Sequence, residues 1–285
     1  MTPAHNLLTF INAEADFAAA RLIIFGAPFD ATASFRPGSR FAPAEIRTFS
    51  QQLETYSPYQ ERDLSEISVC DIGDLTLAHG NAAAMVEAVR EQAAAILAAR
   101  KIPLLLGGEH LVSLGAVQAA AAAYPDLLLL HLDAHTDLRD DYLGERLSHA
   151  TVIRRCHDIL GDGRIFQFGI RSGERDEFLW SGAGHTHLRK FDLGGISETV
   201  EQLQDRPLYL TVDLDILDPS VLPGTGTPEA GGISFEELRA ALTMICREAN
   251  IIACDMTELC PPCDPSGAST AVAAKILREM LLALG

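Results

Sequence analysis

Short, continuously apolar runs alternate with longer helix-forming stretches, and this alternation constrains the fold more than any other feature of the sequence. A strand that is covered on both faces, as in parallel sheets packed between helices, is apolar at every position. The candidate strands are residues 21–27, 67–74, 102–108, 127–133, 164–170, 207–213 and 250–256, and most of these runs are continuously apolar. Helices are expected over 81–100, 234–248 and 269–284, which are rich in Ala, Leu, Glu and Arg. Ser234 and Glu237 also have the spacing of a capping box.

We therefore predict an α/β fold in which helices cover both faces of a doubly wound, mainly parallel sheet, a three-layer sandwich. No linker, repeat or charge run divides the sequence, so a single domain over residues 1–285 is expected. The Pro- and Gly-rich stretch 218–232 falls between a strand and a helix, where functional loops of such sheets lie. The glycine-rich loops that bind nucleotides do not occur, so a nucleotide site is not expected.

The charge balance excludes two classes of partner. The chain has 22 Lys and Arg against 39 Asp and Glu, a formal net charge of −17. Nucleic acids and membrane surfaces require a basic face, so we expect neither as a partner. A cationic substrate suits this acidity, although an acidic surface also serves solubility alone. Residues 1–20 lack the basic start of a leader, and no apolar run approaches the ~20 residues of a membrane span, so a cytoplasmic location is expected.

Candidate metal ligands follow three of the predicted strands at their carboxyl ends. In an open α/β sheet these ends share one edge, which is where ligands bind. Residues at i, i+2 and i+4 of an extended chain point to the same side, so these side chains can converge. The candidates are His110, Asp133, His135, Asp137, Asp213 and Asp215.

Four carboxylates and two imidazoles exceed the three protein ligands that a catalytic zinc ion usually takes. They suit two divalent ions roughly 3.5–4 Å apart that share carboxylates. Four negative charges would balance two such ions, and an oxygen-rich set without thiolates favours Mn²⁺ over Zn²⁺. Each piece alone has an ordinary structural interpretation as a turn, a helix cap or a core histidine. The combination at three strand ends favours a centre with two Mn²⁺ ions.

The segments around these residues are long and distinctive. They are GGEH (107–110), HLDAHTDLRD (131–140), SHAT (148–151), VDLDILDPS (212–220), PGTGTPEAGG (223–232) and DMTEL (255–259). Together they resemble the ureohydrolase family, which includes arginases and agmatinases and hydrolyses guanidino compounds at a binuclear manganese centre. GAPFD (26–30), ETYSPY (54–59) and GIRS (169–172) are more similar to agmatinases than to arginases.

The resemblance implies an arginase-like fold, the same six metal ligands, and a homotrimer or homohexamer. His149 occupies the place of the family's active-site histidine, which helps to move protons. Glu258 occupies the place of the acidic residue that holds the guanidinium, whose planar fork of N–H groups matches a carboxylate. We also expect Asp137, as a ligand, to hold the attacking water by a hydrogen bond. Agmatine is the implied substrate and urea and putrescine the products, a step of polyamine biosynthesis.

Other substrates and one other class of protein remain alternatives. Arginine and 4-guanidinobutyrate carry a carboxylate, which needs a positive charge at the mouth of the site. The loop after the ligands contains Asp140, Asp141 and Glu145, which could accept the ammonium group of agmatine or simply face solvent. A non-catalytic metal-binding protein on the same fold is the alternative class. It predicts the loss of a ligand, of His149 or of Glu258, and none is missing.

Three weaker features complete the sequence-based predictions. His185 and His187 have the spacing of a metal pair, but no carboxylate cluster adjoins them in sequence, which favours a surface loop. Residues 260–263 form a C-P-P-C pattern that can indicate redox chemistry, but without a thioredoxin-like context two buried or partly exposed thiols near the rim of the site are favoured. His131 lies inside a strand run and is expected to pack against a helix.

Overall fold

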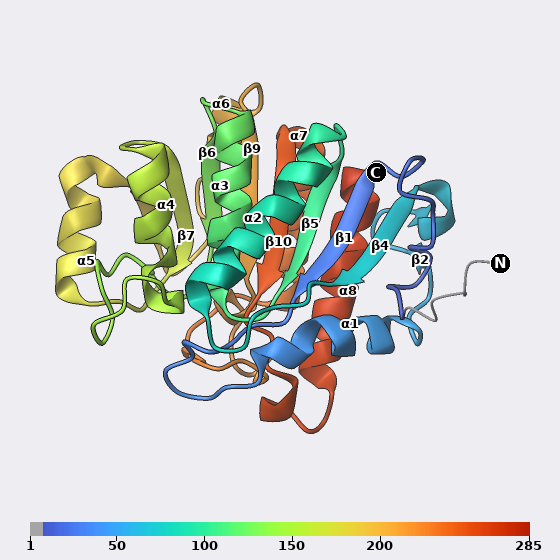
Figure 1. Ribbon diagram of the computed structural model, residues 1–285, viewed down its shortest axis with the longest axis horizontal. Helices are drawn as coiled ribbons and strands as arrows, with labels where there is room; N and C mark the ends of the chain where they lie inside the picture. Colours follow the sequence, from blue (N-terminus) through green and yellow to red (C-terminus); the bar gives the residue numbers. More distant parts are fainter. Residues whose placement is uncertain (1–7) are drawn as a thin grey trace.

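The computed structural model describes residues 8–285, and every strand predicted above is present in it (Figure 1). Residues 1–7, which belong to the opening segment discussed for a leader, lie outside the described residues. The predicted strands are β1 (Leu22–Ala27), β4 (Val69–Asp74), β5 (Ile102–Gly107), β6 (Leu128–Leu132), β7 (Ile165–Ile170), β9 (Leu208–Asp213) and β10 (Ile251–Thr257). The main sheet has one further strand, β8 (His187–Lys190), which was not predicted because it is a short, polar and mostly exposed edge strand.

These strands form one eight-stranded sheet in the order β4-β1-β5-β10-β9-β6-β7-β8. Every neighbouring pair in it is parallel. The predicted parallel, doubly wound sheet is therefore confirmed. A small antiparallel pair, β2 (Tyr56–Ser57) with β3 (Arg62–Asp63), lies outside the main sheet.

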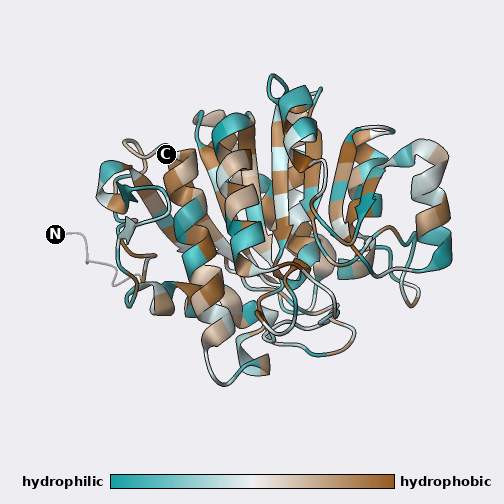
Figure 2. Cartoon of the chain, turned by 180° about the vertical axis from the view of Figure 1, so that it is seen from behind, coloured by the Kyte–Doolittle hydropathy of each residue, from teal (hydrophilic) through white to brown (hydrophobic). Residues whose placement is uncertain are grey.

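Helices cover both faces of the sheet, and each face has its own apolar core (Figure 1). One face packs against α2 (Ala82–Ala98), α3 (Ser113–Ala123) and α4 (Val152–Leu160). The other packs against α1 (Ala42–Ser50), α6 (Ile196–Leu203), α7 (Phe235–Glu248) and α8 (Ala268–Leu284). In β5, Leu104 and Leu106 face one core and Leu105 the other, which explains the continuously apolar runs (Figure 2).

The three predicted helices correspond to α2, α7 and α8. The capping box of α7 is present: the Ser234 hydroxyl accepts from the Glu237 backbone N at 3.2 Å, and the Glu237 carboxylate accepts from the Ser234 backbone N at 2.8 Å. A shorter helix, α5 (Arg175–Trp180), runs into the turn η5 (Ser181–His185) near β8. None of the described helices is long and apolar enough to cross a membrane.

The carboxyl ends of the strands open onto one edge of the sheet, the lower edge in Figure 1, where long loops gather. Single helical turns begin there, namely η3 (His110–Val112), η4 (His149–Thr151), η6 (Leu214–Ile216) and η7 (Pro261–Cys263). Further turns are η1 (Ser39–Phe41) and η2 (Leu64–Glu66). The predicted metal ligands therefore lie in or beside the segments that leave β5, β6 and β9.

Candidate metal centre

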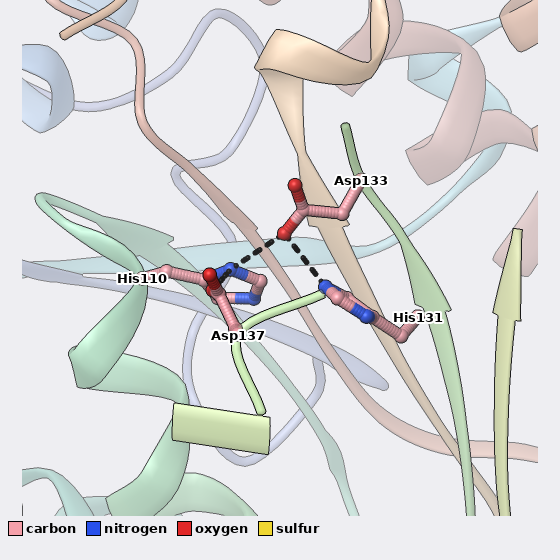
Figure 3. Close-up of side chains that lie close together, drawn as sticks. All are labelled: His110, His131, Asp133 and Asp137. Atoms are coloured by element: carbon pink, nitrogen blue, oxygen red, sulfur yellow. Dashed lines mark hydrogen bonds and ion pairs between the residues drawn. The ribbon is translucent and has the colours of Figure 1, made fainter. Parts of the chain in front are cut away.

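The structure brings all six candidate metal ligands together, in two groups. In the first group, Nδ1 of His110 lies 3.1 Å from Oδ2 of Asp133 and 3.1 Å from Oδ2 of Asp137 (Figure 3). The same nitrogen lies 3.3 Å from Oδ2 of Asp213. In the second group, Nδ1 of His135 lies 3.0 Å from Oδ2 of Asp215 and 3.5 Å from Oδ1 of Asp133. The six side chains come from the ends of β5, β9 and β6 or from the segments that follow them, and β10 lies between β5 and β9 in the sheet.

Asp133 belongs to both groups. Its Oδ2 faces His110 and its Oδ1 faces His135, so one carboxylate connects two clusters of donor atoms. Carboxylates that bridge two ions in this way are typical of binuclear hydrolytic centres. The two groups of donor atoms could each hold a cation, at neighbouring positions.

The hydrogen bonds around His110 leave its Nδ1 free to bind a cation. The Thr211 hydroxyl donates its proton to Asp255 at 2.6 Å, so it can only accept from Nε2 of His110, which lies 2.9 Å away. The proton of the neutral ring is therefore on Nε2. Nδ1 is buried, has no hydrogen-bond partner among the described residues and faces three carboxylates. This is the orientation of a histidine that ligates a metal and donates its other N–H to an outer partner.

Burial makes the negative charge of the cluster costly without a counter-ion. The four aspartates are between 0% and 7% exposed. Burial raises the pKa of Asp213 well above its ordinary value, and repulsion from Asp215 and Asp133 raises it further. Burial alone would lower the pKa of His110, yet the carboxylates that face its Nδ1, that of Asp133 first, raise it well above its ordinary value. Both pKa shifts show that the cluster favours positive charge. Its four carboxylates and two imidazoles fit a pair of divalent cations.

His131 is not the simple packing residue that its place in a strand suggested. Its Nε2 lies 2.7 Å from Oδ2 of Asp133 (Figure 3). Its Nδ1 lies 3.0 Å from the amide nitrogen of Gln167. Because the amide of Gln167 donates to Nδ1, Nε2 carries the proton and donates to Asp133. His131 therefore positions the bridging carboxylate. The i, i+2 spacing of His131 and Asp133 was a signal that could have revealed this.

A cavity of about 270 Å³ adjoins the cluster. His135, Asp137, Asp213 and Asp215 contribute to its wall together with His149 and Glu258, the two residues assigned by resemblance. The Glu258 carboxylate accepts a hydrogen bond from the His110 backbone N at 2.8 Å. Glu258 and Asp137 both have positive φ values, 64° and 52°, which are uncommon for residues other than glycine and concentrate at functional sites.

The loop that contains residues 28–41 supports His149 in a way that the sequence did not reveal. The His149 backbone N donates to the Thr32 hydroxyl at 3.3 Å, and its Nε2 lies 3.1 Å from the Ser34 hydroxyl. Thr32 in turn donates to the buried carboxylate of Glu109 at 2.6 Å. Burial raises the pKa of Glu109 to about 8. Glu109, although adjacent to His110 in sequence, thus holds a loop and not the metal cluster.

The acidic residues of the loop after the ligands do not form the wall of the cavity. Asp140 lies 2.6 Å from Nη2 of Arg155, and Asp141 accepts from the Gly144 backbone N at 3.2 Å. Within residues 8–285, the cavity is lined from this loop by Arg139 and Tyr142, not by these aspartates or Glu145. The hypothesis that the three acids bind the ammonium group is not supported by their positions.

The two cysteines of the C-P-P-C segment are in contact with each other. Sγ of Cys260 lies 2.7 Å from Sγ of Cys263 and 3.6 Å from the carbonyl oxygen of Pro37. Burial raises the pKa of Cys260 to about 12, which disfavours its reactive thiolate. Cys260 is buried and Cys263 is partly exposed, which agrees with the expected burial of the two thiols.

The sheet and its buried His and Asp cluster define an arginase-like α/β protein. The sequence model of the arginase family matches residues 20–283, and the chain belongs to that family. An agmatinase of Bacillus anthracis is 45% identical over 281 residues, 98% of this chain and 97% of that protein. The human mitochondrial guanidino acid hydrolase is 36% identical over 273 residues, 91% of this chain and 77% of that protein. The crystal structure of the agmatine ureohydrolase of Thermoplasma volcanium has a TM-score of 0.90 at 33% identity and covers 99% of this chain and 95% of its own.

Proposed function

We propose that the chain is an agmatinase-type ureohydrolase that converts agmatine to urea and putrescine with two Mn²⁺ ions. One observation supports this most directly: Asp133 is shared between the His110 and His135 groups in a cluster whose cavity also contains Glu258. The full-length similarity to agmatinases supports the choice of substrate. The assigned metal ligands are His110, Asp133, His135, Asp137, Asp213 and Asp215. Because neither a ligand nor His149 nor Glu258 is lost, a non-catalytic metal-binding protein is disfavoured.

A pair of divalent ions, when bound, lowers the pKa of water toward neutrality and stabilises negative charge on the substrate. The carboxylate-rich donor set without thiolates supports Mn²⁺ as the ion. The reaction needs such activation because the guanidinium carbon is a poor electrophile. The other requirements are to orient that carbon and to give a proton to the leaving amine.

We assign the first task to Glu258. Burial raises the pKa of Glu258 well above its ordinary value, and the charge of Glu109 raises it further, so an isolated anion there is unfavourable. A bound guanidinium offsets that cost, and two of its N–H groups can lie in the plane of the carboxylate. The hydrogen bond from the His110 backbone fixes Glu258 relative to a metal ligand. Glu258 would thus orient a planar cation above the metal cluster.

We assign the proton transfer to His149. Burial lowers the pKa of His149, so its imidazole is neutral near pH 7 and can accept a proton and return it to the departing amine. Contacts with Thr32 and Ser34 fix the position of the residue. Asp137, on the same wall of the cavity, would hold the attacking water by a hydrogen bond.

The strongest alternative substrate is a guanidino acid such as 4-guanidinobutyrate, with arginine as a further candidate. Arg139 lines the cavity and offers a positive charge that a substrate carboxylate could use. However, Nη1 of Arg139 already lies 2.8 Å from Oε1 of Glu174, another residue of the wall. That ion pair offsets the charge, which favours agmatine, whose far end is an ammonium group.

The proposed activity also implies a pathway, a location and an assembly for the protein. Release of putrescine would place the reaction in polyamine biosynthesis, and a cytoplasmic homotrimer or homohexamer with one domain per chain, residues 1–285, is the form we expect.

The decisive experiment is to remove metals with a chelator, restore Mn²⁺ and measure urea release from agmatine, arginine and 4-guanidinobutyrate. We expect no urea before restoration and the highest kcat/KM for agmatine afterwards. A preference for 4-guanidinobutyrate would assign the guanidino acid alternative. No urea from any of the three would refute the ureohydrolase assignment.

A further inference from the structure

A second group of histidines and a carboxylate lies at the opposite edge of the sheet from the metal centre. His157 is in the last turn of α4, Asp162 is in the loop that precedes β7, and His185 ends η5. Nε2 of His157 lies 2.8 Å and Nδ1 of His185 lies 2.6 Å from the same oxygen, Oδ1 of Asp162. The three donor atoms are within 4.8 Å of one another. His185 thus acquires a carboxylate neighbour through the fold, and its partner is His157 and not His187.

We propose that His157, Asp162 and His185 form a second metal site, separate from the catalytic centre, that binds a Zn²⁺ ion. Two imidazole nitrogens and one carboxylate oxygen are a ligand set that open zinc sites use, with water as the fourth ligand. The Asp162 side chain is 65% exposed, so an ion and its water can enter from solvent.

The ligand atoms need only a small movement to coordinate an ion. Bonds of about 2.0–2.2 Å in tetrahedral geometry place ligand atoms about 3.3 Å apart. The observed separations of 2.8 Å and 2.6 Å are shorter by roughly half an ångström. Asp162 is in an exposed loop next to Gly161 and Gly163, so its carboxylate can move outward by this amount. The ring nitrogens of the two histidines already lie within 4.8 Å of each other.

Trp180 fixes both histidine rings. The ring of His185 stacks on the indole with centroids 4.3 Å apart and 17° between the planes. The ring of His157 meets it edge-on, at 4.6 Å and 82°. Since the rings are already packed, little side-chain freedom remains to be lost when an ion binds, which favours binding. The negative charge of Asp162 and the acidity of the whole chain add to the attraction for a cation.

The same tryptophan provides a direct test. Trp180 is the single tryptophan of the sequence, so its fluorescence reports on this site and needs no activity measurement. Co²⁺ is the probe, because it takes similar ligands to Zn²⁺ and quenches nearby fluorophores. The protein, with its catalytic centre loaded with Mn²⁺ and free metal removed, is titrated with Co²⁺ and then with Zn²⁺.

We expect saturable quenching by Co²⁺ that Zn²⁺ reverses by displacement. D162N should weaken Co²⁺ binding at least tenfold, and H157N should do the same through a different ligand. The matched control is H187N, because the ring of His187 stacks on Phe166 at 4.5 Å and offers no atom to the cluster; it should bind Co²⁺ like the wild type. The Mn²⁺-dependent turnover of agmatine should be unchanged in D162N.

Two results would overturn the proposal. Equal quenching in the wild type and in D162N would show that Co²⁺ binds elsewhere. No quenching of the wild type would show that Asp162 only accepts hydrogen bonds from the two histidines. Both results leave the ureohydrolase assignment untouched, because that assignment is tested by urea release.

Discussion

The two clusters of histidine and carboxylate differ above all in their burial. At the carboxyl edge of the sheet, Asp133 and Asp213 are 0% and 2% exposed, whereas at the amino edge Asp162 has a side chain that is 65% exposed. Buried anions without water require cations, so the first cluster needs its ions for charge balance. An exposed carboxylate can be satisfied by water and two imidazoles. Similar ligand types therefore form a site that requires cations at the carboxyl edge and a site that is stable without a cation at the amino edge.

Helix α4 connects the two clusters. His149 lies in the turn just before α4 and faces the catalytic cavity, and His157 lies in its last turn. Eight residues of helix correspond to about 12 Å. Groups this far apart without shared partners contribute nearly additively, so changes at one cluster should leave the other unaffected.

The largest effect is expected from D213A, which removes a buried ligand. We expect loss of at least one ion per chain and a fall in kcat/KM on the order of 10³-fold or more, beyond the 10–100-fold cost of an outer-partner change. Metal content and urea release measured on the same sample test this. Full activity with two ions still bound would show that Asp213 is not a ligand. D162N at the exposed cluster is the matched control.

A smaller loss is expected from H149A, which removes a proton-transferring group but no metal ligand. We expect kcat to fall roughly 10²-fold while both Mn²⁺ ions stay bound, because general acid–base groups contribute on this scale. The measurement is steady-state turnover of agmatine with metal analysis. If kcat is unchanged and only KM rises, His149 binds the substrate and does not move a proton. H157A, at the far end of α4, should behave like the wild type.

H131F tests how far the metal centre depends on its outer partners. The change keeps an aromatic ring but removes the N–H that donates to Asp133. We expect Mn²⁺ affinity to fall about 10- to 100-fold, with activity recovered at high Mn²⁺. The comparison is H157F, which alters the exposed cluster and should leave Mn²⁺ affinity at the centre unchanged. If H131F binds Mn²⁺ as tightly as the wild type, His131 contributes only packing and does not position Asp133.

The sequence predicted those features whose signal lies along the chain. Continuous apolar runs identified the buried strands, because strands covered on both faces are apolar throughout. The i, i+2 and i+4 spacing selected the candidate ligands that the structure brings together, but its premise of extended backbone was wrong: Asp215 lies in the helical turn η6, and Asp137 has a positive φ. Strand β8 (His187–Lys190) was missed because a polar edge strand has no such pattern. Helix α3 was missed because it is apolar on every side, as a buried helix is.

Contacts between distant segments could not be predicted in this way. His149 and Glu258 were found through family resemblance, since nothing near them in sequence indicates that they share a cavity. The chain from His110 through Thr211 to Asp255 crosses adjacent strands and depends on their register. Likewise, 23 residues separate Asp162 from His185, so only the return of the chain through α5 and η5 brings them together.

The smallest effect is expected at Asp218, a carboxylate near the catalytic edge whose charge is satisfied by hydrogen bonds and not by a cation. It accepts from the backbone N of Ser220, Gly231 and Gly232, at 2.9–3.1 Å, and from the Ser220 hydroxyl. The Ser220 hydroxyl, with these N–H groups, lowers the pKa of Asp218 to about 2.

Because the folded pKa lies below the unfolded value of about 3.9, Asp218 stabilises the protein above that value. This contribution is lost as the pH falls from about 4 toward 2. We expect D218N to have a slightly lower urea unfolding midpoint than the wild type at pH 5. The difference between the two midpoints should be smaller at pH 3. The control is D205N, a change at an exposed aspartate. Its midpoint difference from the wild type should vary less with pH than that of D218N. If the midpoint difference between D218N and the wild type does not vary with pH, the carboxylate charge does not stabilise the 218–232 loop.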